Sequence, residues 1–239
     1  MDRDHLRTRL QETRTRIASA ASRFGRAADS VGLVAISKRH PAESIRAVAE
    51  AGQRDFGENY LQECLPKMAA LRDLDLVWHF TGQLQSNKTR TVAEHFAWVH
   101  TLDRERIAIR LNEQRPHYAP PLQVCIEIRL EDEPGKGGVP PNEALELARR
   151  VMALPRLKLR GLMCIPPPSE TFEAQRMWFD RLAECLRGLS SQGVELDTLS
   201  MGMSDDLEAA IAAGATLVRI GTAIFGERTD KGLSPSPQT

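Results

Sequence analysis

The chain has 239 residues, of which 41% are hydrophobic and 27% are charged. That is enough for a sizeable buried core in one large domain or two small ones. Lys plus Arg and Asp plus Glu both number 32, so the formal net charge is zero, and aromatic residues make up only 5%. A balanced charge and few aromatic residues argue against general nucleic-acid binding, whether by phosphate attraction or by base stacking.

The N-terminal segment is rich in arginine, which raises the question of a transit peptide. Asp2, Asp4 and Glu12 interrupt the arginines, whereas targeting peptides contain few acidic residues. One helical stripe of this segment is apolar and contains Leu6, Leu10, Ile17, Ala21 and Phe24. We therefore expect a docked helix here. No apolar run reaches the roughly 20 residues that a membrane span needs, so we expect no contact with a membrane.

The cysteines and histidines argue against disulfides and metal sites. Cys64, Cys125, Cys164 and Cys185 lie far apart and form no C-x-x-C pair. Together with the lack of a recognisable signal peptide, this is typical of reduced, mostly buried thiols in a cytoplasmic protein. The histidines show no H-x-x-x-H spacing, so we expect no metal site.

From residue 32 onward, short apolar runs alternate with amphipathic stretches. The apolar runs predict strands at 32–37, 53–56, 76–81, 97–100, 122–128, 157–164, 196–200 and 216–220. Helical patterns lie near 41–51, 59–72, 86–95, 103–114, 141–153, 170–189 and 204–213. Strands separated by such helices pair in parallel through right-handed crossovers. The sequence therefore predicts an α/β fold, a single (β/α)8 TIM-type barrel with an extra N-terminal helix. An open doubly wound sheet is the alternative.

We expect one domain over residues 1–228 and a disordered tail over 229–239, which ends in Ser-Pro-Ser-Pro-Gln-Thr. The helix that begins near residue 170 shows the expected boundary signals. Ser169 or Thr171 can cap its N-terminus, and Gly193 lies just beyond its end.

Lys38 follows the first predicted strand, and the active face of such a barrel lies at the C-terminal ends of its strands. Val34, Ile36 and Lys38 share one strand face, because side chains alternate. If that face points inward, the amine lies at the barrel mouth against apolar walls. Desolvation there lowers the pKa of a lysine and frees the amine to condense with an aldehyde. A solvated lysine at the start of a loop is the alternative.

Two segments near the C-terminus predict an anion site. Residues 199–206 (Leu-Ser-Met-Gly-Met-Ser-Asp-Asp) lead into a predicted helix, and Ser204 could cap that helix and still offer its N–H or hydroxyl. In residues 217–226, a strand ends at Gly221 and Thr222 before a short helix. Phosphate sites in these barrels are often formed by the loops after strands 7 and 8 with a short extra helix. Many helices begin with Ser-Asp-Asp for capping alone, which is the other interpretation.

Three further polar residues lie on or next to predicted strands. Arg219 is a charge inside an apolar strand, which is costly unless the charge is paired. A structural salt bridge and a ligand atom that needs a permanent donor are both compatible with it. Asn59 and His79 could line the pocket or satisfy loop backbone groups. The loop 131–138 lies on the same predicted face, and we expect it to be mobile, with Lys136 solvated.

A lysine for an aldehyde, an anion site for a phosphate and an arginine for a third ligand atom match one molecule, pyridoxal 5′-phosphate (PLP). Five segments of the chain also resemble the pyridoxal phosphate homeostasis protein family. They are LVAISK (33–38), FGENYLQE (56–63), WHFTGQLQSNK (78–88), GLMCIP (161–166) and LSMGMSDDLEAAIAAGATLVRIGTAIFG (199–226). The resemblance runs in order along nearly the whole chain, and the last segment is highly specific.

The resemblance implies a fold similar to the N-terminal barrel of bacterial alanine racemase, without its C-terminal β domain (PLP fold type III). It implies that PLP forms a Schiff base with Lys38, in a protein that takes part in intracellular PLP and amino-acid balance and has no firmly established reaction. By resemblance, Ser204, Gly221 and Thr222 hold the phosphate, with Ser200 close by. Arg219 then faces the pyridine nitrogen. An arginine cannot readily protonate that nitrogen, so the ring should stay a weak electron sink.

The chain departs from the family pattern directly after the lysine. Members of the family often continue Thr-Lys-Pro, whereas this chain has Arg39, His40 and Pro41. The second lysine is missing, so a role for it cannot be carried over. The Schiff base on Lys38 is not affected.

Three functions remain open. The first, which we favour, is a monomeric, non-catalytic PLP carrier or regulator with PLP-dependent apo-enzymes as candidate acceptors. The second is a weak amino-acid racemase, which needs acid and base groups on both faces of its substrate. Alanine racemases take one such tyrosine from a β domain that we expect this chain to lack, and neither Tyr60 nor Tyr118 is well placed to replace it. The third is a Schiff-base sugar-phosphate lyase, which would use Lys38 but gives Arg219 no role.

Overall fold

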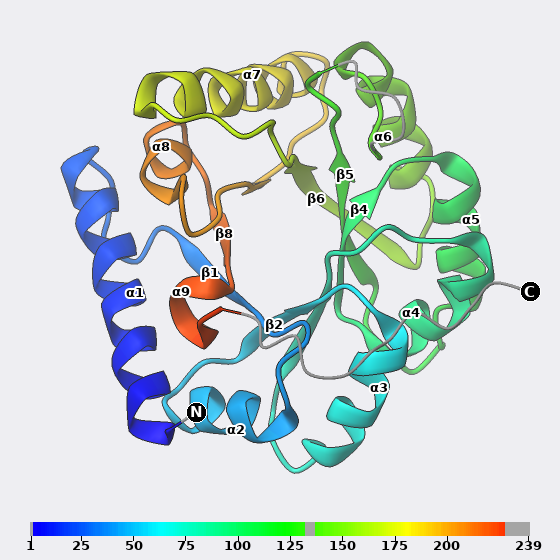
Figure 1. Cartoon of the computed structure of the whole chain (residues 1–239). Helices are drawn as coiled ribbons and strands as arrows, with labels where there is room; N and C mark the ends of the chain where they lie inside the picture. Colours follow the sequence, from blue (N-terminus) through cyan, green and yellow to red (C-terminus); the bar gives the residue numbers. More distant parts are fainter. Residues whose placement is uncertain (1, 132–136, 228–239) are drawn as a thin grey trace, which may run out of the picture.

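A computed structural model describes residues 2–131 and 137–227 and shows a closed barrel of parallel strands in the order β1 to β8 (Figure 1). The strands are β1 Gly32–Ile36, β2 Asp55–Glu58, β3 Val77–Phe80, β4 Trp98–Leu102, β5 Leu122–Glu127, β6 Leu157–Met163, β7 Thr198–Ser200 and β8 Leu217–Ile220. The predicted (β/α)8 barrel is confirmed. The predicted tail at 229–239 and the loop residue Lys136 lie outside the described residues.

The helices follow the strands in turn. They are α1 Arg3–Arg23, α2 Ala42–Glu50, α3 Leu61–Ala70, α4 Thr89–His95, α5 Glu105–Gln114, α6 Ala144–Met152, α7 Phe172–Ser190, α8 Leu207–Ala212 and α9 Thr222–Phe225, with 3-10 turns η1 Ser86–Lys88 and η2 Pro141–Glu143. In the part of the chain that the structure describes, no helix has the length and apolar character to cross a membrane. Each predicted strand and helix is present, with boundaries shifted by a few residues.

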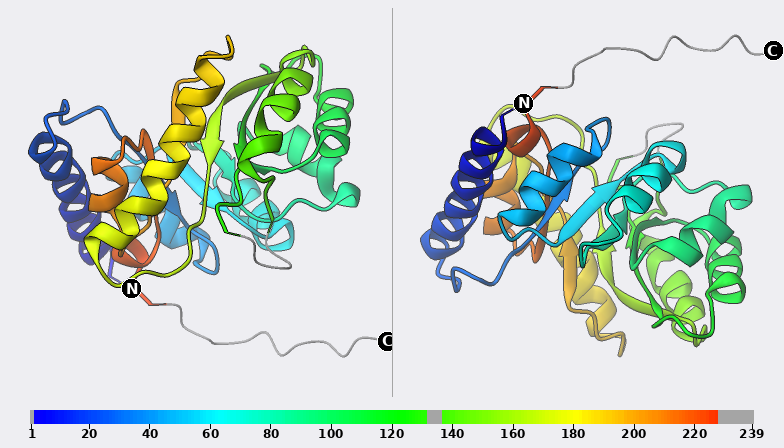
Figure 2. Two further views of the ribbon diagram at one scale, coloured as in Figure 1. Left: turned by 90° about the horizontal axis from the view of Figure 1, so that it is seen from above. Right: turned by 90° about the horizontal axis from the view of Figure 1, so that it is seen from below.

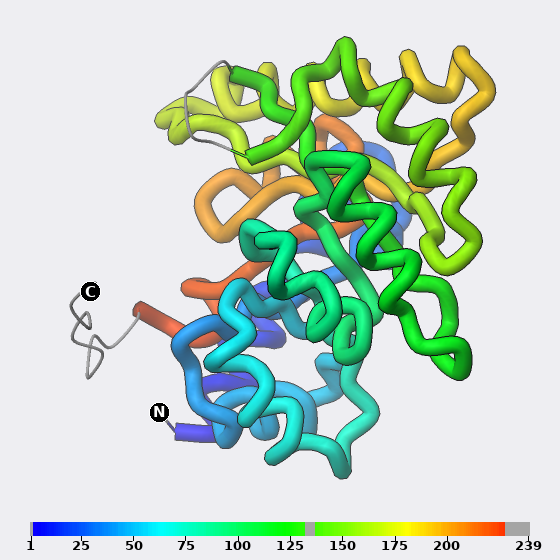
Figure 3. The backbone as a smooth tube through the Cα atoms, turned by 90° about the vertical axis from the view of Figure 1, so that its right-hand side faces the viewer, coloured from blue at the N-terminus to red at the C-terminus, as the bar shows by residue number. Residues whose placement is uncertain are grey.

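The barrel closes because β1 pairs with both β2 and β8. Val34 lies beside Arg219 in the parallel register of β1 and β8, and Ala35 lies beside Phe56 in that of β1 and β2. Figure 3 shows the first and last parts of the chain next to one another as a result. Closure removes both sheet edges and brings the loop after β8 next to the loop after β1.

The N-terminal helix completes the outer layer. Helix α9 is only one turn long and cannot cover β8 and β1 on the outside, and α1 packs against α2, α8 and α9 at that point (Figures 1 and 2). Its apolar stripe is buried as predicted, with Leu6 and Leu10 each 1% exposed. The extra helix therefore fills the gap that the short last helix leaves.

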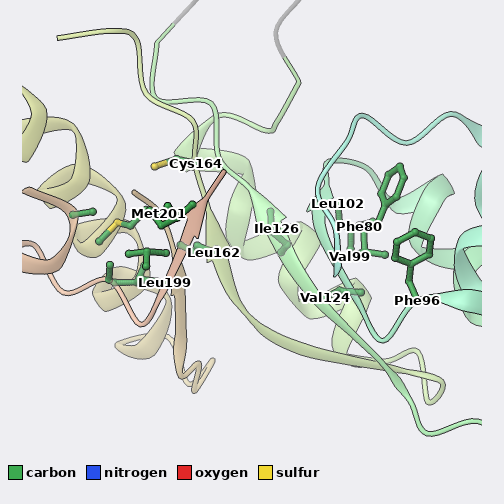
Figure 4. Close-up of a cluster of buried hydrophobic side chains, with 14 of the residues drawn as sticks. Phe80, Phe96, Val99, Leu102, Val124, Ile126, Leu162, Cys164, Leu199 and Met201 are labelled. Carbon is green, nitrogen blue, oxygen red and sulfur yellow. The ribbon is translucent and has the colours of Figure 1, made fainter. Parts of the chain in front are cut away.

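The main core lies between the sheet and the helices. Phe80 and Phe96 meet edge to face there, 5.4 Å apart at their ring centroids and close to Val99 (Figure 4). Side chains alternate along each strand, so the residues between these outward positions face the barrel interior. Trp98, one residue before Val99, belongs to a second, smaller cluster, together with Cys125 and Met163. The interior also contains polar side chains, and these lead to the site.

The long helix α7 shows how local signals set its ends. Thr171 is its N-cap, and the Thr171 hydroxyl accepts a hydrogen bond from the N–H of Ala174. Gly193 has a φ of +80°, the left-handed conformation that glycine adopts without strain beyond a helix C-terminus. Of the two caps that the sequence allows, the structure uses Thr171.

Candidate functional site

A cavity of about 190 Å³ opens at the C-terminal ends of the strands. Its lining comes from the C-terminal ends of β1 and β8 and from the segments after β1, β2, β3, β6, β7 and β8. It consists of Ile36, Lys38, His40, Asn59, Thr81, Ile165, Met203, Ser204, Asp205, Arg219, Gly221, Thr222 and Gly226. Of the eight predicted site residues, the structure brings six to this cavity. His79 and Ser200 are not among the lining residues.

Lys38 lies two residues beyond the end of β1, on the same strand face as the lining residue Ile36. The intervening Ser37 points to the other side of the sheet and is fully buried. The Ser37 hydroxyl donates to a carboxylate oxygen of Glu58 at 2.7 Å, and Lys67 Nζ donates to the Ser37 carbonyl oxygen at 3.0 Å. The backbone that carries Lys38 is therefore held from the helix side of the sheet.

Glu58 and Lys67 form a buried ion pair, with Lys67 Nζ 2.8 Å from Glu58 Oε1. Desolvation raises the pKa of the Glu58 carboxyl, and the charge of Lys67 opposes that rise. A buried carboxylate left without its partner is costly, so the pair fixes α3 on the sheet at one place. That place is directly behind the lysine segment.

The loops after β7 and β8 meet at the cavity. The N–H of Ala223, at the start of α9, donates to the Ser204 hydroxyl at 3.4 Å. Ser204 does not cap α8, the helix that follows it, although its position in the sequence allowed this. The N-cap of α8 is Asp206, which accepts from the N–H of Met203, because the chain makes a turn over residues 203–206 before the helix begins. The Ser204 side chain is directed instead to the neighbouring loop.

Arg16 of α1 holds the β7 loop from outside. Arg16 donates to both carboxylate oxygens of Glu208, at 2.5 and 2.6 Å, and to the carbonyl oxygen of Ser204 at 2.8 Å. The guanidinium fork matches a carboxylate in this bidentate way. The N-terminal helix thus sets the position of a cavity residue almost 190 positions away in the chain.

Gly202 shapes the same loop. Its φ is +95°, and a Cβ there would lie 2.6 Å from the side chain of Ala210. Glycine is therefore required both by the backbone conformation and by the close approach of α8. The Gly202 carbonyl oxygen accepts from the N–H of Arg219, which ties the loop to β8 at the arginine.

Arg219 lies at the inner end of the cavity and is 5% exposed. Its Nη1 donates to the carbonyl oxygen and the hydroxyl of Ser200, at 2.6 and 2.8 Å, and its Nη2 donates to the Cys164 carbonyl oxygen at 2.9 Å. Among the described residues, no carboxylate forms an ion pair with this guanidinium, so the structural salt bridge is not what stabilises it. Burial lowers the pKa of Arg219, but a guanidinium keeps its proton at neutral pH.

His79 and Ser200 lie behind Arg219 and not at the cavity surface. His79 is 1% exposed and contacts Asp55 and His100, and Ser200 is fully buried between His100 and Arg219. His79 does not line the pocket because it lies two residues before Thr81 on the same strand face, deeper in the barrel. Thr81 lines the pocket in its place.

Asn59 lies at the cavity directly after β2. Its side-chain oxygen accepts from the Thr81 hydroxyl at 2.8 Å. Gly82 lets the two loops come this close, since a Cβ there would lie 2.3 Å from the Asn59 carbonyl oxygen. The sequence analysis did not identify Thr81, although the alternation that selected Lys38 also puts Thr81 one step above His79.

Ile165, Met203 and His40 also line the cavity and were not predicted to do so. Ile165 and Met203 are partly exposed at the cavity. The ring of His40 stacks on that of Phe225 in α9, with centroids 4.9 Å apart. No local signal marks these residues, because they reach the cavity only through the juxtaposition of loops.

The site thus contains a primary amine, a buried guanidinium that lines the cavity, and a hydroxyl that contacts the backbone N–H of Ala223. An amine can condense with a carbonyl carbon. A fixed guanidinium can donate to a single acceptor atom, and hydroxyl and backbone N–H groups can bind an anion. The arrangement suits one small ligand that has all three features.

Comparison with known proteins agrees with the fold. Residues 3–229 match the family described as alanine racemase, N-terminal domain. The pyridoxal phosphate homeostasis protein of Pseudomonas aeruginosa is 57% identical over 199 residues, which cover 83% of this chain and 85% of that protein. The alanine racemase of Corynebacterium glutamicum is 17% identical with a TM-score of 0.71 over 98% of this chain and 64% of its own, which shows a shared fold alone.

PipY of Synechococcus elongatus has been solved with and without PLP. The PLP-bound structure is 39% identical to this chain, has a TM-score of 0.78 and is covered over its whole length by 88% of this chain. The structure without PLP gives 40% identity and a TM-score of 0.79, with the same coverage. On these matches, this chain belongs to the pyridoxal phosphate homeostasis protein family and to the wider family of alanine racemase N-terminal domains.

Proposed function

We propose that this protein holds PLP in the cavity at the barrel mouth as a Schiff base with Lys38, and that it serves intracellular PLP homeostasis and amino-acid balance without a catalytic reaction of its own. The observation that carries the proposal is the convergence of Lys38, Arg219 and the paired β7 and β8 loops on one cavity. PLP has an aldehyde, a ring nitrogen and a phosphate, one for each of these groups.

The donor set fits PLP. The protein accounts for three of the five N–H donors of Arg219, and among the described residues the other two have no acceptor. They can serve a ring nitrogen. Ser204, Gly221 and Thr222 would hold the phosphate, with Asn59 on the opposite wall. A Cβ at position 221 would lie 3.3 Å from the Ile36 carbonyl oxygen, so glycine keeps this wall compact. His79 and Ser200 would act on the cofactor through Arg219.

When bound, PLP supplies an aldehyde for amines and a ring that can accept electrons. Arg219 keeps its own proton, so it can hydrogen bond to the ring nitrogen but does not protonate it. The tyrosines do not supply a base either: neither lines the cavity, and Tyr118 is 90% exposed on the loop that enters β5 at the opposite end of the barrel. These features favour a carrier over a racemase.

The proposal also covers the domain organisation, the oligomeric state, the cellular compartment and the partners. We propose that residues 1–228 form one PLP-binding domain, that the protein works as a monomer in the cytoplasm, and that PLP-dependent apo-enzymes receive the cofactor. All four cysteines are free thiols, three of them buried, which suits a reducing compartment.

The first experiment compares the wild type with Lys38→Ala by visible absorbance, before and after borohydride reduction. We expect the wild type to take up PLP with a yellow band, and reduction to fix the cofactor on the peptide that contains Lys38. Lys38→Ala should lose the band because it lacks the amine. Lys158→Ala is the matched control, since Lys158 lies at the opposite end of the barrel near the start of β6.

The outcomes are distinct. A colourless wild type that fails to take up added PLP would overturn the cofactor assignment and leave the sugar-phosphate lyase to be tested. A yellow Lys38→Ala variant would move the Schiff base to another lysine. Amino-acid racemisation by the loaded wild type at enzyme-like rates would contradict the non-catalytic role.

A further inference from the structure

A continuous line of hydrogen bonds crosses the barrel interior and ends at Arg219. Asp55 Oδ1 lies 2.9 Å from His79 Nε2, and His79 Nδ1 lies 2.9 Å from His100 Nε2. His100 Nδ1 lies 2.7 Å from the Ser200 hydroxyl, which lies 2.8 Å from Arg219 Nη1. We call Asp55, His79, His100 and Ser200 the interior relay.

The relay passes through the middle of the barrel. His100 belongs to β4 and Ser200 to β7, and these strands are not neighbours in the closed order. Their side chains can meet only across the interior. His79, His100 and Ser200 are each at most 1% exposed, whereas the Asp55 side chain is 43% exposed at the start of β2. The relay therefore connects the closed end of the barrel with the cavity.

When both imidazoles are neutral, the chemistry of the two ends of the relay fixes which atom donates and which accepts in each hydrogen bond. A carboxylate only accepts, so His79 Nε2–H donates to Asp55. The Nδ1 of neutral His79 must then accept from His100 Nε2–H. The Nδ1 of His100 in turn accepts from the Ser200 hydroxyl, and the Ser200 oxygen accepts from Arg219. All donors point from the arginine toward the aspartate.

The surroundings keep both imidazoles neutral. Burial lowers the pKa of His79, although Asp55 acts in the opposite direction. Burial also holds the pKa of His100 well below its usual range, and the neighbouring His79 and Arg219 add to this effect. The ring of Trp98 stacks on His79, with centroids 5.4 Å apart. A proton added to His79 would reverse the donor order as far as Ser200. The donor order described above therefore requires that His79 is neutral.

Through the relay, Arg219 has an acceptor in a fixed position that carries no charge, the Ser200 hydroxyl. A carboxylate in direct contact would attract the guanidinium away from the cavity and occupy its donors in pairs. A hydroxyl whose own proton is donated to His100 presents its oxygen lone pairs in a fixed orientation. Arg219 is thus held on one side and keeps donors for the cavity.

We propose that the interior relay is a positioning device that fixes the orientation of Arg219 toward its ligand, with His79 and His100 as remote positioning residues that never touch that ligand. The proposal rests on the proposed function, because the ligand of Arg219 is taken to be PLP. It assigns His100, which the sequence analysis passed over, a role equal to that of His79.

The donor order can be measured by NMR on the ¹⁵N-labelled wild type, with and without PLP. We expect two of the six histidines to be neutral Nε2–H tautomers throughout the neutral range and to be assigned to His79 and His100 by substitution. An Nδ1–H tautomer or an imidazolium at either position in the wild type would overturn the relay. This readout does not depend on cofactor binding.

Its effect on Arg219 can be tested with His79→Phe, which retains an aromatic ring against Trp98 but breaks the relay. We expect about ten-fold weaker PLP binding and a shift of the bound-cofactor absorbance band, because His100 loses the acceptor that fixes its tautomer and, through it, the orientation of the Ser200 hydroxyl that holds Arg219. His100 should then change to the Nδ1–H tautomer. His79→Gln retains one donor and one acceptor and should recover a substantial part of the affinity.

His95→Phe is the matched control, since His95 is exposed on α4 and bonds only within its own helix among the described residues. Equal PLP affinity and an equal band position in the His79→Phe and His95→Phe variants would overturn the positioning role. If His79→Phe does not fold, the PLP affinity of His79→Gln and the histidine tautomers of the wild type still test the positioning role. Failure of the wild type to bind PLP would overturn the proposed function instead, and the tautomers would still test the donor order.

Discussion

At the residue scale, the C-terminal end of β5 carries a carboxyl with unusual titration. Glu127 is partly buried, and desolvation together with the nearby Asp103 raises its pKa to about 7. The charge of Arg219 opposes this rise without cancelling it. The folded protein therefore binds a proton at Glu127 more tightly than the unfolded chain does.

A carboxyl with a raised folded-state pKa stabilises the protein at low pH. Its contribution is complete below the unfolded value near 4.5 and is lost as the pH rises through about 7. We expect Glu127→Gln to remove this loss, so that at pH 8 the variant is more stable than the wild type by an amount on the order of 2 kcal/mol. Urea unfolding at pH 5 and pH 8 measures the effect. The exposed Glu195→Gln is the control, and an equal pH dependence of Glu127→Gln and wild type would contradict the assignment.

At the element scale, α1 is joined to the site by Arg16. The helix packs against α2, α8 and α9, and Arg16 adds a bidentate ion pair to Glu208 and a bond to the Ser204 carbonyl oxygen. Hydrogen bonding to Glu208 raises the pKa of Arg16 and lowers that of Glu208. Both side chains are partly exposed, so solvent screens the pair.

We expect Arg16→Ala to cost at most about 1 kcal/mol of stability, but to weaken PLP binding about three-fold because the Ser204 loop loses its anchor. Fluorescence titration with PLP and urea unfolding measure the two effects. Arg7→Ala is the control, since Arg7 lies on the same helix as Arg16 and forms exposed ion pairs with Asp4 of α1 and Glu50 of α2. Parallel losses of affinity in both variants would argue against the Ser204 contact as the cause.

At the scale of the whole molecule, the first and last βα units depend on each other. Strand β1 pairs with β8, and α1 covers this junction from outside. Leu10, in the middle of α1, is 1% exposed and belongs to the core that runs around the barrel. A substitution that weakens the packing of α1 should therefore lower the stability of the whole barrel.

We expect Leu10→Ala to lower the free energy of unfolding by about 2–5 kcal/mol, the range for a large-to-small change in a packed core. The loss should appear in one transition with an unchanged urea m-value, because the barrel unfolds as a unit. Circular dichroism and tryptophan fluorescence should follow the same curve. Ile109→Ala, at an exposed position of α5, should cost far less, and a separate early transition in Leu10→Ala would contradict the coupling.

The order of strands and helices could be predicted from the sequence because each element is specified by signals within its own segment. Apolar runs, helical stripes and caps such as Thr171 act within a few residues, and eight such units in succession favour a barrel. The same alternation along a strand predicted that Val34, Ile36 and Lys38 share a face. Boundaries shifted where tertiary pairing extended a strand, as at β4, which runs to Leu102.

The depth of a residue within the barrel could not be predicted from local sequence patterns. His79 and Thr81 have the same face and similar polarity, and only closure of the barrel decides which of them reaches the mouth. The local sequence allowed Ser204 to cap α8, but a turn before the helix places Asp206 at the N-cap.

The sequence by itself determined the fold class, the lysine after β1 and the loops at β7 and β8, since propensity, alternation and short motifs specify them locally. Only the tertiary structure decided that Arg219 has no carboxylate partner among the described residues, that Arg16 reaches Ser204 and that His100 meets Ser200. These contacts join positions 100 to 188 residues apart in the chain, as the bonds of His100 and Arg16 show. They exist because closure of the sheet brings distant strands around one interior, and no local pattern encodes that geometry.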